Sequence, residues 1–349
     1  MPVREGYQLN IIKPDDLHLH VRNGDIMRTV LPHTAKQFAR AVIMPNIVPP
    51  VCTVEDAVVY KKEILSSLDE DQKFTPLMTL YLTGNTGEKD IKLAKESGEI
   101  LGIKLYPSGA TTNSQFGVSS IKDMAEVFSA MEKYDIPLMV HGEVTDSDVD
   151  VFDREKVFLD KYFSWIVQNF PSLRVVFEHI TTTEAVQYVR SCSSNVGATI
   201  TPHHLILTRN DIFSGGIRPH HYCLPVVKTE SDRASIVNAA VSGDTHFFAG
   251  TDSAPHPVSH KENSCGKAGI YTGWHALPLY AEVFDKKDSL DILESFASVN
   301  GARFYRLPLN AEKITLEKRK TQVPSYFSLP GDRLVPLRSG GEMEWQIFE

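Results

Sequence analysis

The stretch "DDLHLHVR", Asp15 to Arg22, places two histidines in alternation with leucines. Successive side chains of an extended strand point to opposite faces, so His18 and His20 share one face while the leucines occupy the other. Arg22 follows at once. We therefore predict a buried strand over residues 16–20 that ends by directing two imidazoles toward one point.

Further short runs rich in Val, Ile and Leu alternate with helical stretches, which is typical of parallel strands joined by crossover helices. The predicted strands after the first one cover residues 41–46, 76–83, 100–107, 136–143, 173–180, 196–204 and 245–252. Eight strand–helix units are the count of a (β/α)8 TIM barrel, an α/β fold. The alternative is an open doubly wound sheet, but no GxGxxG or P-loop motif follows a strand.

Three of the intervening helices have sequence start signals of the capping-box type. The pairs that carry them are Thr53 with Asp56, Ser120 with Asp123, and Thr181 with Glu184. The alternation of strands and helices stops near residue 309. We expect one domain over residues 1–349, with a barrel core of about 13–308 and an irregular, strand-prone extension over about 309–349 that packs on the barrel.

Composition limits the class of protein. Hydrophobic residues at 42% and charged residues at 23% are those of an ordinary soluble globular protein. A formal net charge of -8 argues against nucleic acid as a partner. The start lacks a signal-peptide pattern and no apolar run approaches the roughly 20 residues of a membrane span, so we expect a cytoplasmic protein without a membrane partner. The four cysteines lie far apart, as expected for reduced thiols.

Polar residues gather at the carboxyl ends of the predicted strands, where barrel enzymes build their active sites. They are His18, His20, Arg22, Asn46, Lys104, His141, His179, Asp252 and His256. Each has an ordinary structural alternative; Asp252, for example, could cap the helix that follows it. Together, histidines and an aspartate at one barrel mouth suit zinc and similar divalent metals.

Lys104 lies inside the apolar run "GIKLY". A charged amine there would be costly to bury and would repel metal ions. It could be a structural lysine that reaches solvent, a Schiff-base lysine, or a lysine carboxylated by carbon dioxide. We favour the carboxylated form, because a carbamate anion able to bridge two metals explains both the lysine and the histidines.

Several strings along nearly the whole chain resemble one known family. They are "DDLHLHVR", "MPN", "KLYPSGATTNS", "HGEVTD", "FEHITT", "ITPHHL", "YCLP" and "GTDSAPH". The set resembles the amidohydrolase superfamily with a binuclear metal centre and, more closely, its dihydroorotases of the class II bacterial type. The resemblance implies reversible zinc-dependent cyclisation of N-carbamoyl-L-aspartate to L-dihydroorotate, the third step of pyrimidine biosynthesis, in a homodimer.

The resemblance also implies residue roles. Two Zn(II) ions would be bridged by hydroxide and by Lys104 as N6-carboxylysine, with Asp252 as the proton-transfer residue. His18 and His20 would bind one metal with Asp252, and His141 and His179 would bind the other. The substrate carboxylate would be held by Arg22, Asn46 and His256, and the pyrimidine edge by backbone near Leu224 and Ala268. Thr111 and Thr112 would lie on a mobile lid.

Three other hypotheses for the function and one departure from the family pattern remain. A hydantoinase-like enzyme could use the same metal centre without needing a carboxylate on its substrate; a Schiff-base aldolase and a scaffold on an inactive barrel are the other hypotheses. His203 and His204 are expected to be structural, since the ligand set is complete without them. Lys267, between "SCG" and "AG", is the departure: the resemblance implies a smaller residue at this position beside the lid.

Overall fold

A computed structural model describes residues 2–348. Within them, an eight-stranded parallel sheet has the order β2-β3-β4-β5-β6-β7-β8-β9. The bridge between Leu19 and Ser253, which follows β9, brings the two edges of this sheet together. The strands are β2 (Asp15–Leu19), β3 (Arg40–Ile43), β4 (Thr75–Tyr81), β5 (Ile100–Leu105), β6 (Leu138–Val140), β7 (Val175–Phe177), β8 (Val196–Ile200) and β9 (Phe247–Ala249). The predicted (β/α)8 barrel is confirmed.

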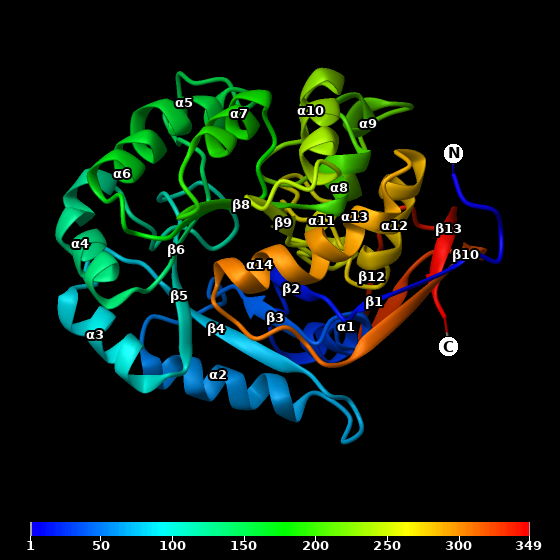
Figure 1. Cartoon of the computed structure of the whole chain (residues 1–349), viewed down its shortest axis with the longest axis horizontal. Coiled ribbons are helices and arrows are strands. Elements are labelled where there is room, and N and C mark those ends of the chain that lie inside the picture. Colours follow the sequence, from blue (N-terminus) through cyan, green and yellow to red (C-terminus); the bar gives the residue numbers. More distant parts are fainter. Residues whose placement is uncertain (1, 349) are drawn as a thin grey trace.

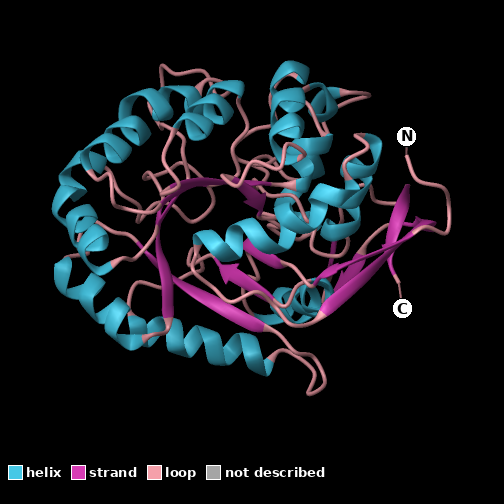
Figure 2. Cartoon of the chain, in the orientation of Figure 1, coloured by secondary structure: helices cyan, strands magenta, loops and turns pink. Residues whose placement is uncertain are grey.

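Helices surround these strands (Figures 1 and 2). The α-helices are α1 (Gly24–Gln37), α2 (Val54–Ser66), α3 (Glu88–Ser97), α4 (Ala125–Tyr134), α5 (Arg154–Phe158), α6 (Ser164–Asn169), α7 (Thr183–Ser191), α8 (Pro202–Ile206), α9 (Asn210–Phe213), α10 (Glu230–Ala240), α11 (Val258–Lys261), α12 (Ala276–Lys286), α13 (Leu290–Glu294) and α14 (Asn300–Phe304). Short 3-10 or π segments are η1 (Ile121–Met124), η2 (Leu159–Phe163), η3 (Pro219–His221) and η4 (Ser295–Val299). No helix of the described chain has the length and apolar character to cross a membrane.

Of the three predicted helix starts, the capping box at Thr53 is confirmed. A helical segment begins after Ser120 as predicted but without the box, and the predicted start at Thr181 was one residue early. Ser120 makes no side-chain cap among the described residues, and the chain there first forms the 3-10 turn η1. Thr182, one residue later than expected, caps α7 by accepting a hydrogen bond from the backbone N–H of Ala185. Glu155 accepts hydrogen bonds from the backbone N–H groups and hydroxyls of both Thr181 and Thr182, and the helix begins after the second of them.

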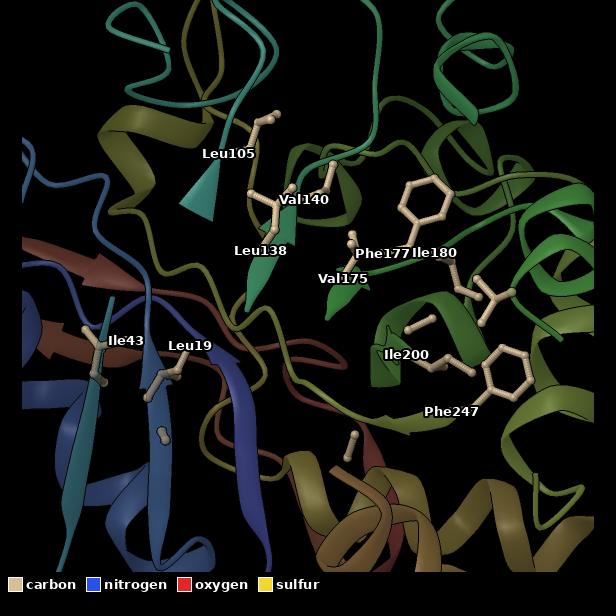
Figure 3. Packing of buried hydrophobic residues seen from close by; sticks show 14 of the residues in the cluster. Leu19, Ile43, Leu105, Leu138, Val140, Val175, Phe177, Ile180, Ile200 and Phe247 are labelled. Carbon is tan, nitrogen blue, oxygen red and sulfur yellow. The ribbon is translucent and has the colours of Figure 1, made fainter. Parts of the chain in front are cut away.

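Buried apolar residues form two layers, one on each side of the strands. Leu138, Val140, Val175 and Phe177 belong to the layer that packs between the strands and the helices (Figure 3). Residues that alternate with them, such as Met139, belong to a separate cluster on the opposite face of the strands, inside the barrel. This alternation decides which polar side chains also point inward.

The C-terminal segment is more regular than expected. β10 (Lys313–Gln322) pairs antiparallel with β1 (Gln8–Ile12) on one side and with β13 (Glu342–Ile347) on the other, and β11 (Phe327–Leu329) pairs with β12 (Asp332–Leu334). Lys318 of β10 contacts Asp285 of α12 at 2.6 Å, which links this sheet to the helices. The domain limits near residues 13 and 308 stay predictions.

Candidate metal centre and active site

Lys104 points into the barrel. Its neighbours in β5, Ile103 and Leu105, pack in the outer layer, so alternation directs Lys104 to the opposite face. The side chain is 0% exposed, and burial lowers the pKa of its amine. The amine contacts the carboxylate of Glu178 and lies 4.6 Å from the centre of the Tyr106 ring.

The structure brings the predicted imidazoles and Asp252 together around this lysine. The Asp252 carboxylate lies 3.4 Å from His18 Nε2 and 3.1 Å from His20 Nε2. The ring of His179 lies 4.9 Å from that of His18 and 4.8 Å from that of His141, measured between centroids. All of these side chains are buried.

Three site residues have left-handed backbone conformations that side-chain-bearing residues rarely adopt. The φ angles are 60° at Arg22, 43° at His179 and 43° at Asp252. Such conformations persist only where surrounding contacts hold them. They occur where the strands end, which is why the predicted strands were too long: β7 stops at Phe177 and β9 at Ala249.

Two buried carboxylates hold these strand ends in place. Asp16 accepts hydrogen bonds from the Thr251 backbone at 2.8 Å, the Thr251 hydroxyl at 2.6 Å and the His18 backbone at 3.2 Å, so it joins the metal-site ends of β2 and β9. Burial raises the pKa of Asp16 to about 6. Glu155 similarly accepts from the backbone and hydroxyls of the threonines that follow His179. The sequence analysis identified neither of them.

Asp252 and His20 have the protonation states that metal ligands require. Burial acts to raise the pKa of Asp252, but the hydrogen bond from His20 and the nearby histidines hold it well below its usual value. Burial, aided by the charge of Arg22, lowers the pKa of His20 to about 3. The site therefore presents a carboxylate and a neutral imidazole, the forms that bind divalent metals.

Glu178 is the main site residue that the sequence analysis missed. Its carboxylate lies 3.0 Å from His18 Nδ1 and also contacts the Lys104 amine. Burial acts to raise its pKa, but the charges of His18 and Lys104 lower the pKa to about 2. The available signal was a charged residue directly before His179 at the end of an apolar strand.

A second carboxylate holds His141. Glu143 Oε2 lies 2.8 Å from His141 Nε2, and both side chains are buried. Metal-binding histidines commonly engage a carboxylate through one ring nitrogen, which fixes the ring and leaves the other nitrogen for the metal. Glu143 gives this arrangement at His141, and on the other side of the cluster Glu178 lies 3.0 Å from His18 Nδ1.

The donor set fits a divalent metal. His18, His20 and Asp252 present ligand atoms within 4.8 Å of one another, as do His18, Glu178 and His179. Buried His179 Nδ1 has no hydrogen-bond partner among residues 2–348, which is costly for a polar atom unless something binds it. Imidazole and carboxylate donors are those of zinc sites.

The predicted substrate residues lie beside the cluster. Arg22 Nη2 lies 3.1 Å from His256 Nε2, and the Arg22 Nε–H donates to the Pro255 carbonyl at 3.3 Å. The side-chain amide of Asn46 donates to the Thr112 carbonyl at 2.9 Å, whereas its buried oxygen has no partner within the described chain. Together these groups offer several hydrogen-bond donors in one small volume.

The lid segment closes over this volume. Thr112 Oγ1 donates to the Ala268 carbonyl at 3.3 Å, which joins the lid to the opposite wall. The remaining cavity is about 20 Å³, room for about one water molecule. It is lined by His20, Arg22, Asn46, Thr111, Thr112, Leu224, Asp252, Ala254, Ala268 and Gly269. A molecule larger than one water would fit only if the segment that carries Thr111 and Thr112 moved.

The other two histidines and Lys267 lie outside this cavity. His204 Nδ1 lies 2.7 Å from the Thr201 hydroxyl and its Nε2 lies 3.0 Å from the Pro225 carbonyl. Cys223, close enough to form a cluster with His203 and His204, donates to the same carbonyl. These contacts are those of a structural histidine at His204, whereas neither buried ring nitrogen of His203 has a hydrogen-bond partner within residues 2–348. Lys267 is exposed, and its side chain does not line the cavity.

Comparison with known proteins shows the family. The model of the amidohydrolase family matches residues 11–319. Dihydroorotase from Acaryochloris marina is 54% identical over 98% of this chain and 99% of that protein. Dihydroorotase from Cupriavidus pinatubonensis is 55% identical over 97% of this chain and 98% of that protein.

Solved structures agree. Dihydroorotase from Campylobacter jejuni has a TM-score of 0.91 and 37% identity, covering 99% of both chains. Dihydroorotase from Saccharomyces cerevisiae, solved with 5-fluoroorotic acid, has a TM-score of 0.90 and 33% identity over 98% of both chains. An L-hydantoinase from Arthrobacter aurescens, at 16% identity and a TM-score of 0.79, shares the fold. The chain belongs to the dihydroorotase family of metal-dependent amidohydrolases, hydrolases of cyclic amide bonds.

Proposed function

We propose that this chain interconverts N-carbamoyl-L-aspartate and L-dihydroorotate, the cyclisation step of pyrimidine biosynthesis. The observation that carries the proposal is the shared cavity, in which Arg22 and Asn46 lie beside Asp252. A substrate with a carboxylate next to a cyclic amide would accept hydrogen bonds from Arg22 and Asn46 through that carboxylate. Its amide carbonyl would then lie at the metal ligands. We further propose that the enzyme acts as a cytoplasmic homodimer, which size-exclusion chromatography with light scattering tests.

We propose two zinc ions as the cofactor. His18, His20 and Asp252 would hold one ion, His141 and His179 the other, and carboxylated Lys104 would bridge them. Carboxylation joins the neutral amine to carbon dioxide and releases one proton, and the burial that lowers the pKa of Lys104 favours the neutral amine. When bound, the metal pair makes hydroxide available near neutral pH and polarises a carbonyl as a Lewis acid.

Glu178 supports this metal site through His18 and Lys104. We expect Glu178→Gln to weaken zinc binding about 10- to 100-fold, because the amide cannot hold the His18 ring as the carboxylate does. Competition with a zinc-binding dye measures the affinity. Glu184→Gln, on an exposed carboxylate that pairs with Lys156, is the control. Equal zinc affinity in Glu178→Gln and the parent protein would contradict the role of Glu178.

Arg22 would bind the substrate carboxylate. A guanidinium offers a planar fork that engages a carboxylate through two hydrogen bonds, while Asn46 and His256 add donors around it. Burying the charged guanidinium of Arg22 costs less free energy because this group already donates a hydrogen bond to the Pro255 carbonyl. A hydantoin ring has no carboxylate to use these donors, so this group of residues favours dihydroorotate over the hydantoinase-like alternative.

Asp252 would move the proton. In hydrolysis its carboxylate accepts the proton that the attacking water loses as the ring amide carbonyl is attacked, and then gives it to the departing ring nitrogen. In cyclisation it takes a proton from the ureido nitrogen as that nitrogen attacks the carboxyl carbon, and water is lost. The lowered pKa of Asp252 keeps the side chain ionised, which is the form that can accept a proton.

For Arg22→Met we expect the KM for dihydroorotate to rise about 100-fold with unchanged zinc content, because a charged hydrogen bond of roughly 1.5–3 kcal/mol is lost. Steady-state kinetics with metal analysis measures both quantities. Arg28→Met, which removes an exposed arginine of α1, is the control and should leave KM unchanged. A parent-like KM in Arg22→Met would refute carboxylate binding at this position.

Substrate preference tests the proposed function itself. We expect the purified protein to convert dihydroorotate to N-carbamoyl-L-aspartate, and the reverse, but to leave hydantoin intact. Turnover of hydantoin in preference to dihydroorotate would keep the metal centre and overturn the carboxylate pocket. Trapping of a keto substrate by borohydride would instead support the Schiff-base alternative at Lys104.

A further inference from the structure

Lys261, the last residue of α11, is a buried lysine to which the mechanism assigns no role. Its side chain is 3% exposed. The ammonium donates to three backbone carbonyls, those of Tyr222 at 2.9 Å, Lys267 at 2.7 Å and Gly269 at 2.8 Å. An ammonium has three N–H donors, so the three contacts use its full capacity.

These carbonyls come from the two segments that form one wall of the substrate cavity. Lys267 and Gly269 flank Ala268, and Tyr222 lies two residues before Leu224; both Ala268 and Leu224 line the cavity. The Gly269 N–H also donates to the Tyr222 carbonyl at 3.0 Å. Lys261 therefore joins two segments about forty-five residues apart in sequence at the point where they face the site.

The wall is packed closely around this junction. A Cβ atom at Gly269 would lie 2.5 Å from the Ala254 carbonyl oxygen, so only glycine fits there. The lid meets the same wall, since the Thr112 hydroxyl donates to the Ala268 carbonyl. A shift of the Ala268 backbone would therefore change the cavity and the surface on which the lid closes.

The chemistry of Lys261 suits positioning. Burial lowers its pKa to about 8, which leaves the amine protonated near neutral pH. A buried charge is costly unless it is fully hydrogen-bonded, and an apolar side chain of the same length would leave three carbonyls without this donor. A single ammonium at the junction orients all three carbonyls at once.

We propose that Lys261 is a positioning residue that sets the spacing of the Leu224 and Ala268 backbones, and through it the fit of the pyrimidine edge. The inference rests on the proposed role of this wall in substrate binding. It predicts that loss of the ammonium weakens substrate binding while the metal ligands, which lie on other segments, stay loaded.

The test compares Lys261→Met with Lys228→Met in the zinc-loaded enzyme. Lys228 is also buried and donates to one carbonyl, that of Val226, but does not line the cavity. We expect the KM for dihydroorotate to rise at least about 10-fold in Lys261→Met, with unchanged zinc content, since about 1.4 kcal/mol of binding corresponds to a factor of ten. Lys228→Met should lower the Tm and keep the parent KM.

A merely structural role for Lys261 would lower the Tm and leave the KM of the folded fraction unchanged, and that result would overturn the proposal. If Lys261→Met is not recovered folded, Lys261→Gln carries the same expectation, because its amide has two donors on a shorter stem and cannot meet three carbonyls. Arg22→Met, assayed alongside, separates the two claims: a raised KM there with a parent KM at Lys261→Gln rejects only the role of Lys261.

Discussion

Replacement of Lys104 by alanine is expected to remove most of the bound zinc and to lower dihydroorotate turnover at least about 10³-fold, because the proposed bridge between the two metals would be lost. The side chain is fully buried and faces the imidazole cluster, so water has little access to replace the missing ligand. Metal analysis and initial rates in both directions measure the effect.

Rescue distinguishes a lost carbamate from a lost amine. We expect acetate or propionate to restore part of the zinc content and activity of Lys104→Ala, since a small carboxylate can occupy the place of the carbamate. Lys122→Ala, on an exposed lysine of η1, is the control and should match the parent. Full activity in Lys104→Ala without added acid would defeat the proposal of a bridging carboxylysine.

Replacement of Asp252 by asparagine is expected to lower kcat at least about 10³-fold in both directions, because proton transfer by a positioned carboxylate is removed. The amide keeps the shape and one oxygen of the side chain, so the effect separates proton transfer from packing. Rates of hydrolysis and cyclisation at saturating substrate, with metal content measured on the same samples, give the comparison.

Asp244 offers a matched control close to the other end of β9. Its carboxylate lies 2.7 Å from His246 Nδ1 and 3.1 Å from Arg190 Nε, away from the metal cluster. Residues at the amino ends of barrel strands act on stability rather than chemistry, so Asp244→Asn should lower the Tm and leave kcat unchanged. Ordinary kcat values in a zinc-loaded Asp252→Asn would remove Asp252 from the proton-transfer role.

Much of the fold was predictable because each barrel strand is a short apolar run between helical stretches. The strand ends were not, because the backbone leaves the extended conformation at the site: His179 and Asp252 have positive φ angles that contacts from distant residues hold in place. The start of α7 was predicted one residue early because Glu155, distant in sequence, accepts hydrogen bonds from both Thr181 and Thr182, a contact that the local sequence does not show.

The site followed from the same pattern. Polar residues at the carboxyl ends of strands must meet in a barrel. The residues expected at the metals and at the substrate do lie together, and eight of them line one cavity. Glu178 and Lys261 were missed because nothing in their local sequence reveals their partners. Glu178 contacts a lysine on another strand. Lys261 contacts backbone carbonyls, and because every residue has one, the sequence does not show which of them Lys261 binds.

The most direct test of the account is metal removal and restoration in the purified protein, with bound zinc counted per chain and dihydroorotate turnover measured at each step. We predict that activity is lost with the metal and returns as two zinc ions per chain are bound, in both directions of the reaction. Full turnover in the metal-free protein would contradict the central claim that these buried residues form a catalytic two-metal centre. Full activity of a protein whose histidine cluster holds no zinc would contradict it as well.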